Sequence, residues 1–362
     1  MSADSLPLFL YFSMKARFRL KARLANESLP QEPIAKLGGH DGPISAVEFT
    51  HDGKYVVTGS WDRTVRLSNP LRLDPAHPPP QVSSGHHDDV RLEDLPQALP
   101  IQVYSDGITH PISAVAVDDQ STTLVAGSEK TLVVLDCLTS QCKRRLQGHV
   151  GRINAVGVNK GSEVYLSASY DASVRLWDGR SRSPEPIQIL KEAKDSVTCI
   201  HSVESEYMTI IRTASVDGIV RTYDLRMGML QCDDVHSPIT GMCATGDQRC
   251  LAVNCLDGAL RLLDLEKGAL LRHYADEHTA GQYGLNCALS AGDDYIVTGS
   301  EDGSVVIYDI SKGRACQVLE GHRQPTCSVA VHPKVDFASV VVSASFDGTA
   351  IVWGNDTSLM QW

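Results

Sequence analysis

The sequence lacks the common catalytic and metal-binding signatures and has few aromatic residues. Aromatic residues make up 6% of the 362 positions. The chain contains no glycine-rich phosphate loop, no His-Glu-x-x-His motif and no Gly-x-Ser-x-Gly turn. Its ten cysteines include no Cys-x-x-Cys pair and no cluster with histidine at zinc spacing. We therefore predict a protein without metal, cofactor or disulfide framework.

Basic charge is also scarce. The chain has 33 lysine and arginine residues against 44 aspartate and glutamate residues, which gives a net charge of −11 and a pI near 5.6. Binding nucleic acid through charge needs clustered lysine and arginine that displace counterions. We expect proteins as partners and no direct contact with nucleic acid.

Long apolar runs are missing as well. The run at residues 6–12 holds seven residues, far too few to span a membrane, so no membrane partner is expected. Residues 1–28 carry five basic and no acidic residues between Ser5 and Asn26. We interpret them as a disordered N-terminal extension; the alternatives are a mitochondrial presequence or a start codon upstream of the true start at Met14.

What the sequence does contain is a turn with an acidic residue that recurs seven times, followed six residues later by a closing segment. The clearest copy runs from Ser169 to Asp178, and the acidic positions are Asp62, Glu129, Asp171, Asp217, Asp257, Asp302 and Asp347. Successive closing residues are 67, 42, 46, 40, 45 and 45 positions apart. A period of about 40 to 45 residues with four short strands is typical of WD-repeat β-propellers. The pattern predicts an all-β, seven-bladed propeller over residues 29–362.

Only the first spacing is abnormal. Residues 71–98 contain five prolines and show no strand alternation, so we predict a disordered insertion in the first repeat, after which a strand resumes near Pro100. A metal could bind the cluster at residues 86–89, two histidines followed by two aspartates, but an isolated cluster on a polar loop is more often solvated.

The two ends of the repeat region predict how the ring closes. The seventh repeat stops soon after Trp353 and lacks its outermost strand, whereas residues 33–37 precede the first Gly-His pair. We expect this N-terminal strand to complete the last blade, which removes the open sheet edges.

Within a repeat, histidine, serine, aspartate and tryptophan predict a buried hydrogen-bond network, because buried polar groups need partners. The predicted sets are His149, Ser169, Asp171 and Trp177 in the third repeat, and His322, Ser345, Asp347 and Trp353 in the seventh. The first repeat has Ser68 in place of tryptophan, and the sixth has Tyr308. A hydrolytic triad uses similar residues but would not recur at the period of the repeat, so we predict no enzyme.

The residue before each acidic turn position is expected on the upper face, around the central channel. Three of these residues are aromatic, namely Trp61, Tyr170 and Phe346, and Glu301 lies on the same rim. Exposed aromatics gathered on one surface commonly form the centre of an interface. The alternative is that each ring packs over its own turn. We predict a protein-docking patch formed by Trp61, Tyr170 and Phe346.

Three segments, residues 170–186, 216–228 and 260–264, resemble the mitogen-activated protein kinase organizer family of WD-repeat proteins. The resemblance extends over roughly residues 30–354 but not over residues 1–28 or the insertion. It implies a scaffold for kinase-cascade components that is also found in the activated spliceosome, in cytoplasm and nucleus. It further implies that Arg180, Arg182 and Arg226 form a contact surface on the lower face, although loop arginines are often simply solvated.

The sequence thus predicts a non-catalytic interaction scaffold, monomeric outside its complexes, in pre-mRNA splicing or mitogen-activated protein kinase signalling. The alternative is a substrate-recognition subunit of a ubiquitin ligase, which usually carries an additional adaptor-binding domain. The sequence shows no such domain.

Overall fold

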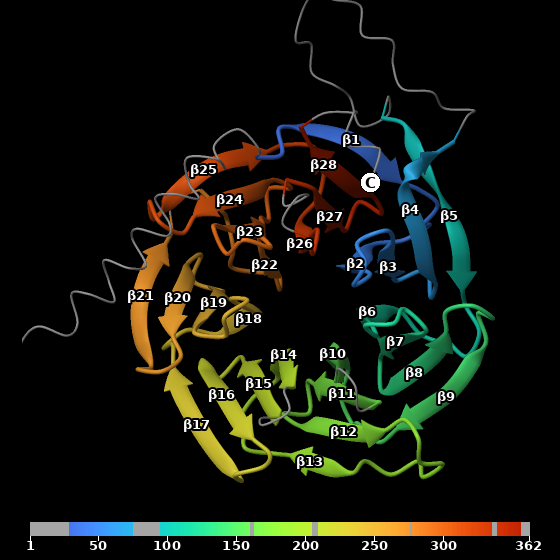
Figure 1. Ribbon diagram of the computed structural model, residues 1–362, viewed down its shortest axis with the longest axis vertical. Coiled ribbons are helices and arrows are strands. Elements are labelled where there is room, and N and C mark those ends of the chain that lie inside the picture. The colour runs from blue at the N-terminus through green and yellow to red at the C-terminus, as the bar shows by residue number, and fades with distance from the viewer. Residues whose placement is uncertain are drawn as a thin grey trace, which may run out of the picture.

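The computed structural model describes residues 29–74, 95–159, 163–204, 209–275, 277–334 and 339–355. All regular structure in these ranges is β-strand, as predicted. Figure 1 shows the strands arranged as a ring of sheets, and residues of the inner strands line a central channel. The predicted N-terminal extension and the histidine cluster at residues 86–89 lie outside the described residues.

Each sheet runs from the channel to the rim. The innermost strands are β2 (Ile44–Phe49), β6 (Ile112–Val117), β10 (Ile153–Asn159), β14 (Val197–Glu204), β18 (Ile239–Ala244), β22 (Cys287–Leu289) and β26 (Thr326–Val331). The next strands outward are β3 (Val56–Ser60), β7 (Thr123–Ser128), β11 (Val164–Ser169), β15 (Thr209–Ser215), β19 (Cys250–Cys255), β23 (Tyr295–Gly299) and β27 (Val341–Ser345).

The outer half of each sheet contains two further strands. The third strands are β4 (Val65–Leu73), β8 (Thr131–Asp136), β12 (Val174–Asp178), β16 (Ile219–Asp224), β20 (Leu260–Asp264), β24 (Val305–Asp309) and β28 (Ala350–Gly354). The strands at the rim are β5 (Gln97–Tyr104), β9 (Cys142–Gln147), β13 (Gln188–Leu190), β17 (Met229–Asp234), β21 (Ala269–Tyr274), β25 (Arg314–Leu319) and β1 (Glu32–Leu37).

The ring closes through the N-terminal strand. The strands form five sheets of four strands and one of eight, with the order β2-β3-β4-β5-β1-β28-β27-β26. Within the large sheet, β1 pairs antiparallel with β28 from Glu32 opposite Gly354 to Leu37 opposite Ala350. The predicted completion of the last repeat by the N-terminal strand is therefore confirmed. The same strand also pairs in parallel with β5 through Lys36 and Leu37.

The predicted limits of the first-repeat insertion are wrong at both ends. Strand β4 continues to Leu73, and β5 begins at Gln97, before Pro100. Leu73 pairs with Ala98, and the Lys36 N–H donates to the Pro96 carbonyl at 2.9 Å. Proline is tolerated in this segment because it accepts at its carbonyl and need not donate. Residues 75–94 lie outside the described residues.

Apolar side chains between neighbouring sheets form the core. Strands in the middle of a sheet, such as β7 and β19, are buried at every position because they are covered on both faces. One cluster packs Val57 and Tyr104 of the first sheet against Ile112 and Leu124 of the next. The outer strand β17 is mostly exposed. The short apolar runs in the sequence are thus strands that are buried on both faces between neighbouring sheets. They do not alternate between apolar and polar residues as a strand with one exposed face does.

Small polar residues link the inner strands of neighbouring sheets. Ser45 donates its hydroxyl to the Ile112 carbonyl at 2.6 Å, and Thr198 donates to the Ile239 carbonyl at 2.8 Å. The strand register shifts at these positions, and such a bulge turns the side chain toward the next sheet. We call this set the seam; its side chains are Ser45, Ser113, Asn154, Thr198, Thr240 and Cys327. Cys327 donates to the Ile44 carbonyl, so the seam also links β26 and β2, the two end strands of the eight-stranded sheet.

Candidate interaction site at the mouth of the channel

A buried hydrogen-bond network joins loop, turn and strand in the β10–β13 sheet. His149 Nδ1 lies 3.0 Å from Asp171 Oδ2, and His149 Nε2 lies 2.8 Å from Ser167 Oγ. The Trp177 indole Nε1–H donates to the same Ser167 oxygen at 2.9 Å. His149, Ser167 and Trp177 are buried, so each of these polar groups needs a partner within the protein.

Strands β26–β28 of the eight-stranded sheet, with the loop before them, repeat this arrangement. His322 Nδ1 lies 3.2 Å from Asp347 Oδ2, and His322 Nε2 lies 2.8 Å from Ser343 Oγ. The Trp353 Nε1–H donates to Ser343 Oγ at 2.7 Å. Because the network recurs at two places in the ring, it is a structural element of the repeat rather than a reaction site.

The prediction that Ser169 and Ser345 join histidine to tryptophan is wrong. Ser167 and Ser343, two positions earlier, make those bonds. Ser169 instead donates to the Arg152 carbonyl at 2.9 Å and accepts from the Asp171 N–H at 3.2 Å. Side chains two apart on a strand share a face, so the residue pattern did not distinguish them.

Two sheets without a Gly-His pair, β14–β17 and β18–β21, hold the turn aspartate with arginine. Arg221 Nη2 lies 2.6 Å from Asp217, and Arg261 Nη2 lies 2.5 Å from Asp257. In each case the arginine follows the aspartate by four residues. This spacing of aspartate and arginine is visible in the sequence and is a signal for the pair.

The electrostatics of the network argue against catalysis. Burial acts to raise the pKa of Asp171, but hydrogen bonds from Ser173, the Val150 N–H and His149 lower it well below its usual range. Burial lowers the pKa of His149, with Asp171 opposing that effect. The imidazole is therefore neutral at pH 7 and the carboxylate ionised. Because Ser167 is buried between His149 and Trp177, no substrate reaches its hydroxyl.

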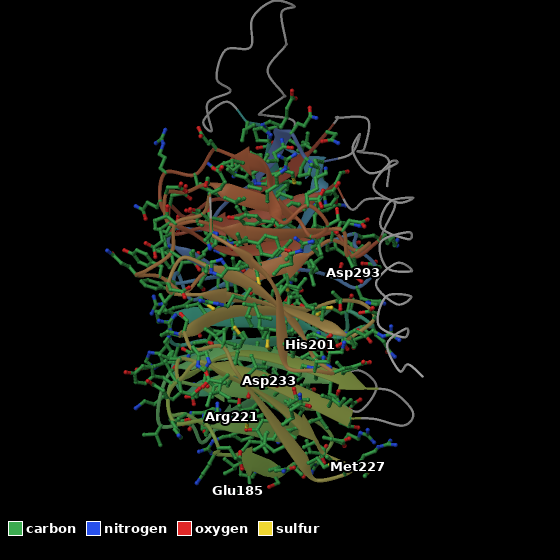
Figure 2. All side chains as sticks on the ribbon, turned by 90° about the vertical axis from the view of Figure 1, so that its left-hand side faces the viewer. Glu185, His201, Arg221, Met227, Asp233 and Asp293 are labelled. Carbon is green, nitrogen blue, oxygen red and sulfur yellow. The ribbon has the colours of Figure 1, made fainter. Side chains whose placement is uncertain are left out.

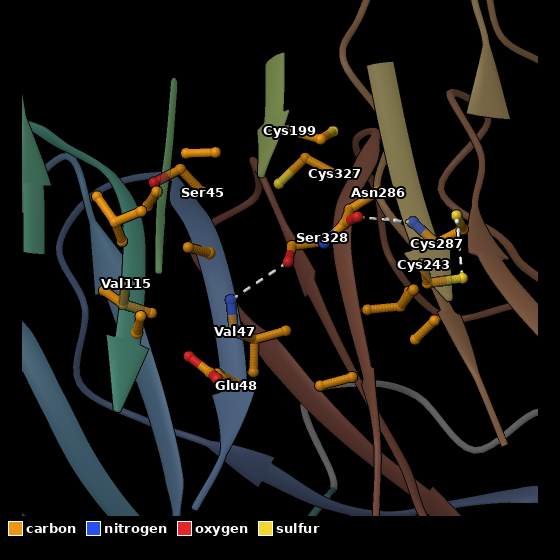
Figure 3. Close-up of a pocket in the computed structure, with 18 of the residues that line it drawn as sticks. Ser45, Val47, Glu48, Val115, Cys199, Cys243, Asn286, Cys287, Cys327 and Ser328 are labelled. Atoms are coloured by element: carbon orange, nitrogen blue, oxygen red, sulfur yellow. Dashed lines mark hydrogen bonds between the residues drawn. The ribbon is translucent and has the colours of Figure 1, made fainter. Parts of the chain in front are cut away.

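The central channel is lined by the inner strands and encloses about 1120 Å³. Figure 3 shows Val47, Val115 and several cysteines around it, with the Val47 N–H donating to Ser328 Oγ at 3.3 Å. The Cys243 and Cys287 sulfurs lie 3.5 Å apart. Within the described ranges, no group of three or more His, Cys, Asp or Glu side chains is placed to hold a metal ion.

At one mouth of this channel three aromatic rings and an arginine form a row. The Trp61 and Phe346 rings lie 5.9 Å apart, and the Tyr283 ring lies 5.5 Å from Phe346. The Arg152 guanidinium lies 6.0 Å from the Trp61 ring centroid, within the range of a cation–π contact. All four residues line the channel. We call Trp61, Phe346, Tyr283 and Arg152 the aromatic cluster.

The structure brings together only part of the predicted docking patch. Trp61 and Phe346 are neighbours across the ring closure, and Trp61 is 42% exposed. Tyr170 is 69% exposed and makes no ring contact with them among the described residues. Tyr283, 41% exposed, takes the place expected for Tyr170. Its loop carries no copy of the acidic-turn pattern, so the sequence gives no signal for it.

Glu301 positions the aromatic cluster from within. Its Oε1 accepts the backbone N–H groups of Gly281, Gln282 and Tyr283 at 2.8, 2.6 and 2.8 Å. A carboxylate that receives three N–H donors fixes the loop that carries Tyr283. The structure therefore gives Glu301 an internal partner, where the sequence analysis expected a partner-binding role.

The predicted lower-face arginines lie on exposed loops. Arg180 Nε lies 3.9 Å from Glu163 Oε2, and both side chains are largely exposed. Arg182 and Arg226 are exposed. An exposed ion pair of this length contributes little to stability.

The ring of sheets and its repeated His–Asp and Ser–Trp bonds define a WD-repeat β-propeller. The family model "WD domain, G-beta repeat" matches residues 31–68, 140–178, 271–309 and 313–354. The chain belongs to the WD-repeat family.

Curated relatives align with nearly the whole chain. WD repeat domain-containing protein 83 of Rattus norvegicus is 35% identical over 91% of this chain and 94% of its own length. The human protein of that name is 37% identical over 84% and 87%, and the Dictyostelium discoideum homolog is 29% identical over 88% and 96%.

Among solved structures, the crystal structure of the WD40 beta propeller domain of Doa1 superposes with a TM-score of 0.70. It covers 90% of this chain and 98% of that domain at 19% identity. A likeness at this identity supports the fold alone. In the part of the chain that is described, no helix is long and apolar enough to cross a membrane.

Proposed function

We propose that this chain is a non-catalytic scaffold, a seven-bladed ring that holds other proteins in one complex. In this proposal the eight-stranded sheet counts as two blades, because among the described residues the parallel β1–β5 pairing at Lys36 and Leu37 is the strand pairing that joins its halves. The seam supports this count, since Cys327 of β26 bonds to Ile44 of β2 just as Ser45 of β2 bonds to Ile112 of β6.

The aromatic cluster is the observation that carries the scaffold function. Three rings from separate loops converge at the channel mouth, and two of them remain more than 40% exposed. Keeping large apolar rings in contact with water costs free energy unless a partner covers them. Arg152 beside Trp61 adds a positive charge to the row. The cluster suits a protein segment with an apolar anchor and an adjacent acidic side chain.

We assign the complexes to pre-mRNA splicing, in the activated spliceosome, or to mitogen-activated protein kinase signalling, with the chain monomeric outside them and present in nucleus and cytoplasm. The similarity to WD repeat domain-containing protein 83, also called mitogen-activated protein kinase organizer 1, supports this assignment. The net charge of −11 supports protein rather than nucleic-acid partners.

The test is affinity purification of the tagged chain from its own cells, read by quantitative mass spectrometry. We compare wild type with a Trp61→Ala, Tyr283→Ala, Phe346→Ala variant. Tyr170→Ala is the matched control, because Tyr170 is exposed but lies outside the cluster. Truncating a central interface residue costs about 2 kcal/mol or more, so the triple variant should lose its partners while the control keeps them.

The identity of the lost partners decides the cellular role. Spliceosomal proteins support assembly in splicing, and kinases with their adaptors support signalling. The docking proposal is overturned if a folded triple variant retains every partner of wild type. Circular dichroism and thermal melting of the variant establish that it is folded.

A further inference from the structure

The loop between β12 and β13 carries the run Arg180-Ser181-Arg182-Ser183-Pro184. Ser183 and both arginines are exposed, and the hydroxyl of Ser183 accepts the Glu185 N–H at 3.2 Å. Figure 2 shows the neighbouring Glu185 at the margin of the molecule. A hydroxyl in this setting can be presented to another enzyme by opening one local turn.

A serine followed by proline occurs at only two places in the sequence, and threonine followed by proline at none. The second place is Ser237-Pro238, where Ser237 is 6% exposed. Two aspartates, Asp233 and Asp234, precede it, whereas arginines precede Ser183. The chain therefore offers one accessible Ser-Pro site, set among basic residues, and one buried site that serves as an internal control.

Arg144, a half-buried residue of β9, holds the same loop through hydrogen bonds to its backbone. Arg144 of β9 donates through Nη1 to the Asp178 carbonyl at 2.6 Å and through Nη2 to the Ser183 carbonyl at 2.6 Å. Arg144 has only neutral carbonyl acceptors in these contacts, and no carboxylate among the described residues lies within ion-pair distance of it. Its guanidinium thus lies against the Ser183 backbone, bonded to uncharged acceptors.

We propose that Ser183 is the phosphorylation site of a proline-directed serine/threonine kinase, and that the phosphate is held by Arg144 and Arg182. The Ser183 oxygen attacks the γ-phosphorus of Mg·ATP supplied with the kinase. A bond forms between that oxygen and phosphorus, the bond from phosphorus to the β–γ bridging oxygen breaks, and ADP leaves. The hydroxyl proton passes to the kinase's catalytic aspartate.

Phosphorylation would change both the charge and the order of this loop. A phosphoserine carries a charge of about −1.5 to −2 at pH 7 and three strong acceptor oxygens. Bonds between phosphate and guanidinium are roughly twice as strong as neutral hydrogen bonds. The β12–β13 loop on the lower face would then change from basic to neutral or negative. Its phosphate would bind Arg144 and so hold the loop against β9. The inference does not depend on the aromatic cluster.

The first experiment maps phosphates by mass spectrometry on the purified full-length chain after incubation with an active mitogen-activated protein kinase and Mg·ATP. We expect one phosphate on Ser183, none on Ser237, complete loss in Ser183→Ala and no loss in Ser237→Ala. The peptide of residues 178–188 is the positive control. Phosphorylation of that peptide without phosphorylation of Ser183 in the folded chain would overturn the proposal. So would the absence of Ser183 phosphate in chain purified from phosphatase-inhibited cells.

The second experiment tests whether Arg144 binds the phosphate. The second ionisation of free phosphoserine lies near pKa 6, and a neighbouring guanidinium lowers it. Titration followed by ³¹P NMR should give a lower phosphate pKa in the wild-type chain than in Arg144→Gln, with Arg144→Lys in between. Equal midpoints in all three chains would exclude Arg144 as the phosphate ligand. Before the titration, thermal melting of both variants is measured, and a cooperative transition shows that each is folded.

Discussion

At the scale of single residues, the serine of the network is the most sensitive position. Ser167→Ala leaves His149 Nε2 and the Trp177 N–H without a partner inside the protein. We expect a loss of about 2 to 4 kcal/mol in the free energy of unfolding. Ser169→Ala removes only the turn bonds to Arg152 and Asp171, and should cost about 1 kcal/mol. Urea denaturation measures both, and equal losses would contradict the corrected assignment.

Buried histidines should make the fold weaker in mild acid. Burial lowers the pKa of His149 and of His278 below the usual 6.5, so the unfolded chain binds more protons there than the folded chain. Stability contributed by this difference is present above pH 6.5 and is lost as the pH falls below it. We expect a loss of about 1 kcal/mol between pH 7 and pH 5.

The variant that checks this is His278→Gln, whose amide can still reach the Tyr308 hydroxyl that lies 2.9 Å from His278 Nδ1. Urea midpoints should depend less on pH in this variant than in wild type. His236→Ala serves as the control, because that side chain is 84% exposed. An unchanged pH dependence in His278→Gln would refute the assignment.

At the scale of elements, the link between β1 and β5 joins the first and last parts of the ring. The Lys36 N–H donates to the Pro96 carbonyl at 2.9 Å. Lys36→Pro removes this donor, whereas Lys36→Ala keeps it. We expect the proline variant to unfold with a free energy lower by more than about 1 kcal/mol and the alanine variant to match wild type. Similar thermal melts for the two variants would show that the link is dispensable.

The sequence predicted the elements well where a residue type at a fixed position in the repeat has one structural role. The turn aspartates predicted the repeat. The N-terminal strand at residues 33–37 predicted the ring closure, because an incomplete last repeat must be completed by another strand. The limits of β4 and β5 were not predictable, because Leu73 and Ala98 pair across a segment that is rich in proline. Tyr283 joins the aromatic cluster through a loop outside the repeat pattern, held by Glu301. Such a contact depends on three-dimensional placement that spacing along the chain does not encode.

At the scale of the whole molecule, the seam makes the ring a single cooperative unit. Linear repeat arrays fray from their ends, because each repeat contacts only its neighbours. Here Cys327 of β26 donates to Ile44 of β2, and β1 completes the last sheet, so the ring has no free end from which to fray. Five of the six seam residues follow a buried apolar residue, as Thr198 follows Val197, whereas Cys327 follows Thr326. Serine and threonine on short strands carry no obvious signature, so the seam was not predictable from the sequence.

Loss of one seam bond should therefore weaken the whole ring without dividing it. Thr198→Val keeps the volume and the β-branch of the side chain but removes the hydroxyl that donates to the Ile239 carbonyl at 2.8 Å. We expect the free energy of unfolding to fall by about 1 kcal/mol. Transitions followed by far-UV circular dichroism and by tryptophan fluorescence should remain coincident, because Trp177 and Trp353, in different sheets, unfold together. Separate midpoints for the two signals would show that the sheets unfold one by one and that the closed seam does not couple them.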